Sequence, residues 1–121
     1  SGDFVVTWHS SQQDGDDYGI YGQRYNSDGS TDGSEFQIHS TTVNAQKGSS
    51  VTALSNNGFV VTWTSYGQDG GSIYDGGVYG QRYSDTGAPV GSEFPVNTHT
   101  NLNQRHSAVA ELDNGSFVVT W

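Results

Sequence analysis

The chain has 121 residues, of which 31% are hydrophobic and 17 are glycine, and its formal net charge is −9. The shortage of Leu and Ile argues against a helical bundle, and thirteen carboxylates against four cations argue against nucleic acid or an anionic membrane surface as a partner. Cysteine is absent, which excludes a disulfide scaffold and a thiolate metal site, and no apolar stretch is long enough to predict membrane insertion.

One five-residue segment, Phe-Val-Val-Thr-Trp, occurs three times and makes the sequence a tandem repeat. Its copies begin at Phe4, Phe59 and Phe117, so the spacings are 55 and then 58 residues. Alternate side chains of a strand point to opposite faces, and in this segment both faces are largely apolar. Such a strand has to be covered on both sides, as in a sheet stacked between two others.

Each repeat is predicted to contain four short antiparallel strands separated by Gly, Asn and Asp turns. In the second copy, strands are expected at Phe59–Trp63, Val78–Tyr83, Glu93–Asn97 and Ser107–Leu112. Asn57-Gly58 is expected to form a hairpin turn that leads into Phe59. The all-β content and repeat size favour β-propeller blades, and a β-sandwich built from the two repeats is the alternative.

The repeat boundaries predict two blades and the first strand of a third. These units are residues 1–58, 59–116 and 117–121. Two blades cannot close a ring, so we expect other copies of the repeat to complete it. These copies would come from the same chain or from a homo-oligomer joined head to tail.

Four ordered blocks resemble a repeat of very large secreted bacterial proteins. The blocks are Phe59–Trp63, Gln68-Asp69-Gly70, Gly77–Tyr83 and Gly91–Phe94, and together with the first copy they cover essentially the whole chain. In that family the repeats form long arrays beside RTX-type or cadherin-like modules, in proteins described as calcium-binding or adhesin-like. The resemblance implies a secreted or cell-surface location. The loop of the first copy is shorter, so loop functions can differ between copies.

Acidic loops that follow the first strand of each repeat are the candidate Ca²⁺ sites. Asp14, Asp16 and Asp17 fall within four residues, and Asp69 and Asp75 are the counterparts of Asp14 and Asp17 in the second copy. Ca²⁺ takes about six to eight oxygen ligands, including carbonyls that a Gly-rich loop can turn inward. The spacing matches neither the EF-hand nor the RTX nonapeptide, so a solvated Asp and Gly turn is the alternative.

Two pairs of charged residues recur at matched positions and are predicted to be structural. Arg24 lies in the second strand and Glu35 at the start of the third, and Arg82 and Glu93 repeat this arrangement. Arg and Glu across one turn are close enough for a bidentate ion pair. A catalytic Arg and Glu would show the same spacing, but their repetition favours an ion pair within each blade.

The aromatic residues divide into repeated and unrepeated ones. Trp8, Trp63 and Trp121 end the repeated strand, which favours core packing over stacking on sugar rings. The tyrosines that lie in loops and have no aromatic counterpart in the other copy are the better candidates for contact with glycans: Tyr18, Tyr66 and Tyr74.

No catalytic arrangement can be derived from the order of the residues. The four histidines, His9, His39, His99 and His106, occupy no equivalent repeat positions, which argues against a repeated zinc site or a shared general base. We therefore expect a non-catalytic extracellular module with a structural or adhesive role, stabilised by Ca²⁺. A lectin-like propeller that binds carbohydrate is the first alternative, and a polysaccharide-degrading propeller is the second.

Overall fold

The computed structural model describes residues 2–121 as β-strands joined by turns. The strands are β1 (Phe4–Ser11), β2 (Tyr18–Tyr25), β3 (Thr31–Gln37), β4 (Gln46–Ala53), β5 (Phe59–Tyr66), β6 (Gly76–Tyr83), β7 (Pro89–Pro95), β8 (Ala108–Glu111) and β9 (Phe117–Thr120). A short 3₁₀ turn, η1 (Asp113–Gly115), precedes β9. The all-β prediction is confirmed, and no helix in residues 2–121 is long and apolar enough to cross a membrane.

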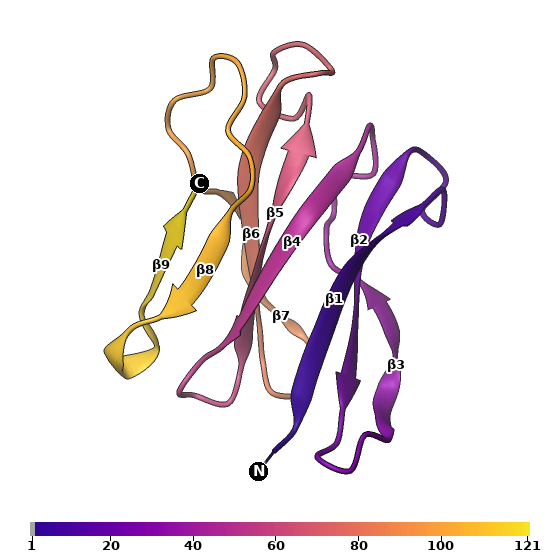
Figure 1. The fold of residues 1–121 in the computed structure, drawn as a ribbon, viewed down its shortest axis with the longest axis vertical. Coiled ribbons are helices and arrows are strands. Elements are labelled where there is room, and N and C mark those ends of the chain that lie inside the picture. The colour runs from indigo at the N-terminus through magenta and orange to yellow at the C-terminus, as the bar shows by residue number, and fades with distance from the viewer. Residues whose placement is uncertain (1) are drawn as a thin grey trace.

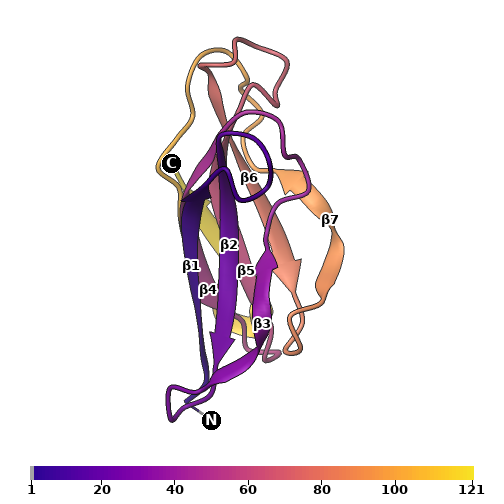
Figure 2. The ribbon, with the colours of Figure 1, turned by 90° about the vertical axis from the view of Figure 1, so that its right-hand side faces the viewer.

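The strands form three antiparallel sheets that are stacked side by side (Figure 1). The first sheet is β1-β2-β3, the central sheet is β4-β5-β6-β7, and the third is β8-β9. β4 lies between β1 and β8, and Figure 2 shows the first sheet in front of the central one. The stack therefore has three sheets, whereas a sandwich has two, and residues 2–121 do not close into a barrel or a propeller.

The sheets divide the chain at different points from the sequence repeats. The central sheet runs from Gln46 to Pro95, because β4, at the end of the first repeat, forms a hairpin with β5. Asn57 turns the chain with a φ of 66°, and its N–H donates to the carbonyl of Leu54 at 3.0 Å. The central and third sheets thus each combine strands from two successive repeats.

The strand β5 is buried on both faces, as its apolar sequence predicts. On the side of the first sheet it joins the main core, whose buried members are Ile20, Ile38, Phe59, Val61, Trp63, Tyr79 and Tyr83. On the opposite side, the hydroxyl of Ser107, just before β8, donates to Thr62 Oγ1 at 3.0 Å. The central sheet is therefore held between its two neighbours.

The third strand of each repeat, β3 or β7, begins earlier than predicted. The prediction covered only the second half of the strand, and a bulge separates it from the first half. In the β6–β7 ladder the register shifts between Gly80 and Arg82. The buried side chain of Gln81 bridges this shift, since its Nε2 donates to the carbonyls of Arg82 at 2.9 Å and Gly91 at 3.2 Å. Gln23 makes the equivalent contacts in the first sheet. Each bulge is thus fixed by a glutamine amide rather than by ladder hydrogen bonds.

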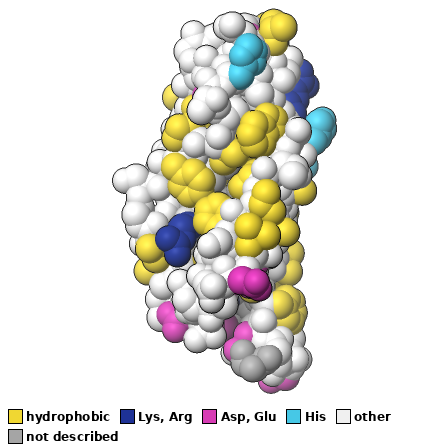
Figure 3. All heavy atoms as spheres, turned by 90° about the vertical axis from the view of Figure 1, so that its left-hand side faces the viewer, with side chains coloured by type: hydrophobic (Ala, Val, Ile, Leu, Met, Phe, Trp, Pro, Cys, Tyr) yellow, Lys and Arg dark blue, Asp and Glu magenta, His cyan; other side chains and the backbone are white. Residues whose placement is uncertain are grey.

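Apolar side chains are exposed at both ends of the stack. On the outer side of the first sheet, Phe4 is 48% and Val6 is 43% exposed. At the other end, hydrophobic side chains gather over the side of the molecule formed by β8 and β9 (Figure 3). They include Leu112, Val118 and Trp121.

Candidate functional site

Asp14, the first predicted calcium ligand, points into the protein and faces His39. The two side chains are 1% and 0% exposed, and Asp14 Oδ2 lies 3.4 Å from His39 Nε2. On its other side, His39 Nδ1 lies 2.6 Å from the carbonyl oxygen of Thr41. A Cβ atom at Gly19 would lie 2.6 Å from His39 Nε2 and 2.7 Å from Asp14 Oδ2. The glycine at the start of β2 therefore makes room for the buried pair.

Asp69 occupies the same place in the second repeat, with uncharged partners. It accepts hydrogen bonds from the hydroxyl of Tyr79 and from Nδ2 of Asn97, the latter at 3.2 Å. Burial, followed by the hydrogen bond to Asp69, raises the pKa of Tyr79. Gly77 lies against the carboxylate as Gly19 does in the first repeat. Both aspartates thus point into the protein, Asp14 toward the segment after β3 and Asp69 toward β6 and the segment after β7.

The other predicted calcium ligands do not converge on a common point. Asp16 Oδ2 accepts a hydrogen bond from the backbone N–H of Asn44 at 2.8 Å, and Asp75 Oδ2 accepts one from the N–H of Ser72 at 3.3 Å. Asp17 is exposed. Within residues 2–121, no three His, Cys, Asp or Glu side chains come together as a metal site. The five aspartates therefore do not form a ready-made donor set for Ca²⁺, and calcium binding would require the acidic loops to rearrange.

Arg24 pairs with Asp32, so the prediction that it pairs with Glu35 is wrong. The β2–β3 register places Asp32 directly opposite Arg24, on the same face of the sheet. Glu35 lies beyond the register shift and accepts a hydrogen bond from Gln13 instead. Sequence spacing gave no sign of this bulge.

The predicted pair of Arg82 with Glu93 is also absent. Among residues 2–121, no carboxylate lies within 4.0 Å of Arg82, because Val90 takes the place opposite it. Glu93 accepts hydrogen bonds from both the backbone N–H and the hydroxyl of Ser40 at 2.9 Å, and from Gln68 at 2.7 Å. Since Ser40 follows the first sheet, Glu93 ties the first and central sheets together.

The three repeated tryptophans differ in burial. Trp63 is 0% exposed in the central sheet, which confirms its predicted place in the core. Trp8 is half-buried and follows the alternation of Phe4 and Val6, so it lies on the uncovered side of β1. Trp121 follows β9 and is 56% exposed. The same sequence position therefore differs in burial from one sheet to the next.

Two of the candidate glycan tyrosines lie in strands, Tyr18 at the start of β2 and Tyr66 at the end of β5, so the prediction that they lie in loops is wrong. Each carries a cation over its ring. Lys47 Nζ lies 3.9 Å from the ring centre of Tyr18, and the guanidinium of Arg105 lies 5.7 Å from that of Tyr66. Lys47 and Arg105 are equivalent in the repeat. Cation–π contacts of this kind attract the charge to the face of the ring. Lys47 lies in β4 of the central sheet, and Arg105 lies in the segment that leads into β8.

The chain matches no protein-family model, no curated protein and no solved structure.

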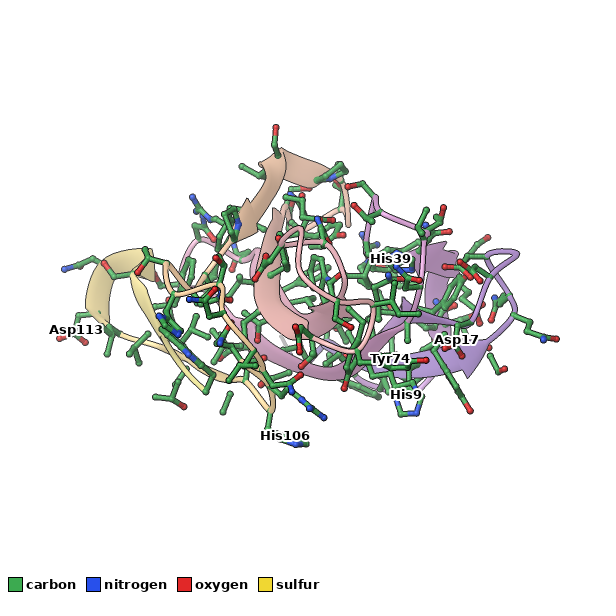
Figure 4. All side chains as sticks on the ribbon, turned by 90° about the horizontal axis from the view of Figure 1, so that it is seen from above. His9, Asp17, His39, Tyr74, His106 and Asp113 are labelled. Carbon is green, nitrogen blue, oxygen red and sulfur yellow. The ribbon has the colours of Figure 1, made fainter. Side chains whose placement is uncertain are left out.

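The loops at one end of the stack enclose a groove that we call the tyrosine groove. Its volume is about 430 Å³, and its lining includes Asp17, Asn44, Lys47, Tyr66, Tyr74 and Arg105. Figure 4 looks down on this end, where Tyr74, which is 76% exposed, lies near Asp17. The structure thus brings two of the three predicted glycan tyrosines together. The groove also contains two cations, Lys47 and Arg105, that were not predicted as site residues. The only sign of them in the sequence is that they are equivalent in the repeat.

Proposed function

We propose that this chain is a non-catalytic structural or adhesive module whose sheets stack as β-propeller blades, in a secreted or cell-surface protein. The tandem repeat, the net charge of −9 and the absence of cysteine support this role. The observation that carries the proposal is a sheet face that occurs twice in the chain, once covered and once exposed.

The covered example lies on the central sheet. There the rings of Phe59 and Tyr83 stack with centroids 4.9 Å apart and an angle of 12° between their planes. Each residue is 5% exposed, because the first sheet packs over it. We call this side of a sheet, with the Phe and Trp of the repeated strand, its aromatic face.

The exposed example lies on the first sheet. Phe4 and Tyr25 stack with centroids 5.1 Å apart and an angle of 9°, which reproduces the stack on the central sheet. Nothing in residues 2–121 covers this pair, and Phe4 is 48% exposed. An exposed, preformed apolar face favours a docking surface, and the covered copy supports the choice of the surface that would fit it.

That surface is the opposite, smaller-residue face of a sheet of the same kind. The central sheet presents such a face to β8 and β9, with Thr62 hydrogen-bonded to Ser107. On β9 the outward side chains of the corresponding face include Val118, which is 43% exposed. An aromatic face therefore meets a small-residue face at each step, and this makes the contact heterologous and head to tail. We take a second copy of this chain as the occupant.

The experiment measures the mass of the protein in solution by sedimentation velocity as its concentration rises. The mass of the unaltered chain is expected to rise steadily, because head-to-tail contacts need not close. Val6→Glu places a charge on the aromatic face and Val118→Glu on the small-residue face, and each is expected to prevent growth beyond the monomer. Leu102→Glu is the control, since Leu102 is 74% exposed in the loop before β8.

Mixing the two blocked variants tests the polarity of the contact. Each retains one intact face, so the mixture is expected to form a one-to-one dimer and nothing larger. A chain that remains monomeric at every concentration would contradict the proposal. If either single variant grew to the size reached by the unaltered chain, these faces would not be the contact.

A further inference from the structure

The tyrosine groove concentrates positive charge in an otherwise acidic protein. Of the four cations in the chain, Arg24 is paired with Asp32, at the opposite end of β2 from Tyr18. Lys47 and Arg105 both line the groove, and within residues 2–121 neither has a carboxylate within 4.0 Å. Their N–H groups are thus able to donate to a ligand.

The rings of two tyrosines hold these cations in place. Lys47 lies over Tyr18 and Arg105 over Tyr66, so the charged groups are fixed against aromatic faces. A guanidinium is planar and presents its donors in a fork that matches a carboxylate. The arrangement therefore provides an oriented carboxylate receptor whose two cations are not paired with any carboxylate of residues 2–121.

Tyr74 adds an apolar platform that the fold itself does not require. It is 76% exposed, and its loop is three residues longer than the equivalent loop of the first repeat. Its N–H is bonded to the hydroxyl of Ser72 at 3.2 Å, which fixes a turn at the tip of the loop. Exposed tyrosines combine a flat apolar body with a polar hydroxyl, and both suit contact with a sugar ring.

The surrounding charge restricts the ligand. A net charge of −9 repels polyanions, and Asp17 contributes a carboxylate to the same groove. A carboxylate can accept hydrogen bonds from sugar hydroxyls. These features fit a ligand with one carboxylate and several hydroxyl groups better than an extended chain of acidic units.

We propose that the tyrosine groove binds a sugar bearing one carboxylate, such as a terminal uronic acid residue. The carboxylate lies against Arg105 and Lys47, the ring packs on Tyr74, and the hydroxyls reach Asp17 and Asn44. The groove is formed within one chain and does not depend on head-to-tail assembly, so the two proposals can fail separately.

The test is a titration with methyl β-D-glucuronide and with methyl β-D-glucoside, followed by the NMR signals of the tyrosine rings. The two sugars differ only in one group, which is a carboxylate in the glucuronide and a hydroxymethyl group in the glucoside. We expect the glucuronide to bind with a Kd on the order of 1 mM and the glucoside about tenfold more weakly. Arg105→Gln is expected to lower the affinity for the glucuronide to that for the glucoside.

Two further variants separate stacking from general charge. Tyr74→Ala is expected to weaken both sugars by the same factor, and its unfolding midpoint is expected to match that of the unaltered chain because the side chain is exposed. Arg24→Gln removes the same charge far from the groove and is expected to leave both affinities unchanged. Equal affinity for the two sugars, no saturable binding of either, or an equal loss in Arg24→Gln would each overturn the proposal.

Discussion

Tyr18 and Tyr66 occupy the same rung of two successive sheets, although they are not equivalent in the repeat. Ser11 lies opposite Tyr18 in the β1–β2 ladder, and Tyr66 lies opposite Gly76 in the β5–β6 ladder. In the repeat, Ser11 aligns with Tyr66 and Tyr18 aligns with Gly76. Residues opposite each other share a face of the sheet, so the ring has moved from one strand to its neighbour. In both sheets a cation lies over that ring, Lys47 from β4 and Arg105 from the segment before β8.

This relationship predicts an energetic coupling between Tyr18 and Lys47. A double-mutant cycle with Tyr18→Ala and Lys47→Ala is expected to give a coupling free energy of about 0.5–1 kcal/mol, as for a cation–π contact near the surface. The contact of Tyr66 with Arg105 is longer, at 5.7 Å, and is expected to couple more weakly. Urea unfolding of the four proteins measures the cycle. Additive effects of the two substitutions would show that the contact contributes nothing.

The alternation of side chains predicted the fold better than it predicted the sites. Both faces of the repeated strand are apolar, so its burial between two sheets could be expected from residues such as Val60 and Trp63. The partner of Arg24 could not be predicted in this way. A bulge shifts the β2–β3 register, and this shift decides that Asp32, and not Glu35, lies opposite Arg24. A bulge is set by tertiary contacts, here those of the Gln23 amide, and leaves no periodic signal in the sequence.

The direction in which loop side chains point could not be predicted from the sequence either. Asp14 and Asp69 were predicted as Ca²⁺ ligands, with a solvated turn as the alternative, but each points inward against a glycine near the start of the next strand. The repeated Asp and Gly were both visible in the sequence, yet their contact was not. Tyr66 and Tyr74 were selected because they break the repeat, and the structure does bring them to one groove.

The repeated tryptophans are expected to differ in their contribution to stability. Trp63→Ala should lower the free energy of unfolding by about 3–5 kcal/mol, because the side chain is 0% exposed and the sheets around it cannot collapse fully. Trp121→Ala should lower it by less than about 1 kcal/mol, since that ring is 56% exposed. Denaturant unfolding monitored by circular dichroism compares the two. Similar losses would show that burial does not determine the role of this position.

The hydroxyl of Tyr83 is expected to hold the first and central sheets together. It donates to the carbonyl of Ile38 at 2.6 Å, in a buried contact between the two sheets. Tyr83→Phe leaves that carbonyl without its donor and should cost about 1–3 kcal/mol. Tyr25→Phe is the matched control, because its ring makes the same stack on a half-exposed face, and it should cost less than about 0.5 kcal/mol. Equal effects would assign the loss to the ring rather than to the bond.

Alkaline pH is expected to destabilise the fold through two buried tyrosines. Burial is the main cause that raises the pKa of Tyr79 and of Tyr83 above the ordinary value of 10.0, and nearby carboxylates add to it. The neutral phenol is thus favoured in the folded state, so its contribution is complete below about pH 10 and is lost as the pH rises through the raised pKa. The free energy of unfolding, measured from about pH 8 to 11, should fall above about pH 10. A flat profile would contradict this, and Tyr83→Phe should make the fall shallower.

Calcium dependence tests the acidic loops. Asp69 accepts hydrogen bonds from interior side chains and Asp16 accepts one from the N–H of Asn44, so a Ca²⁺ site would have to break these bonds. Asp14 would also have to leave its buried place opposite His39. We therefore expect about 1 mM Ca²⁺ to shift the thermal unfolding midpoint no more than the same concentration of Mg²⁺ does, at constant ionic strength. Asp69→Asn should lower the midpoint equally in chelator and in calcium, because its role is to accept hydrogen bonds inside the protein. A rise specific to Ca²⁺, lost in Asp16→Asn, would show instead that the first loop rearranges around the ion.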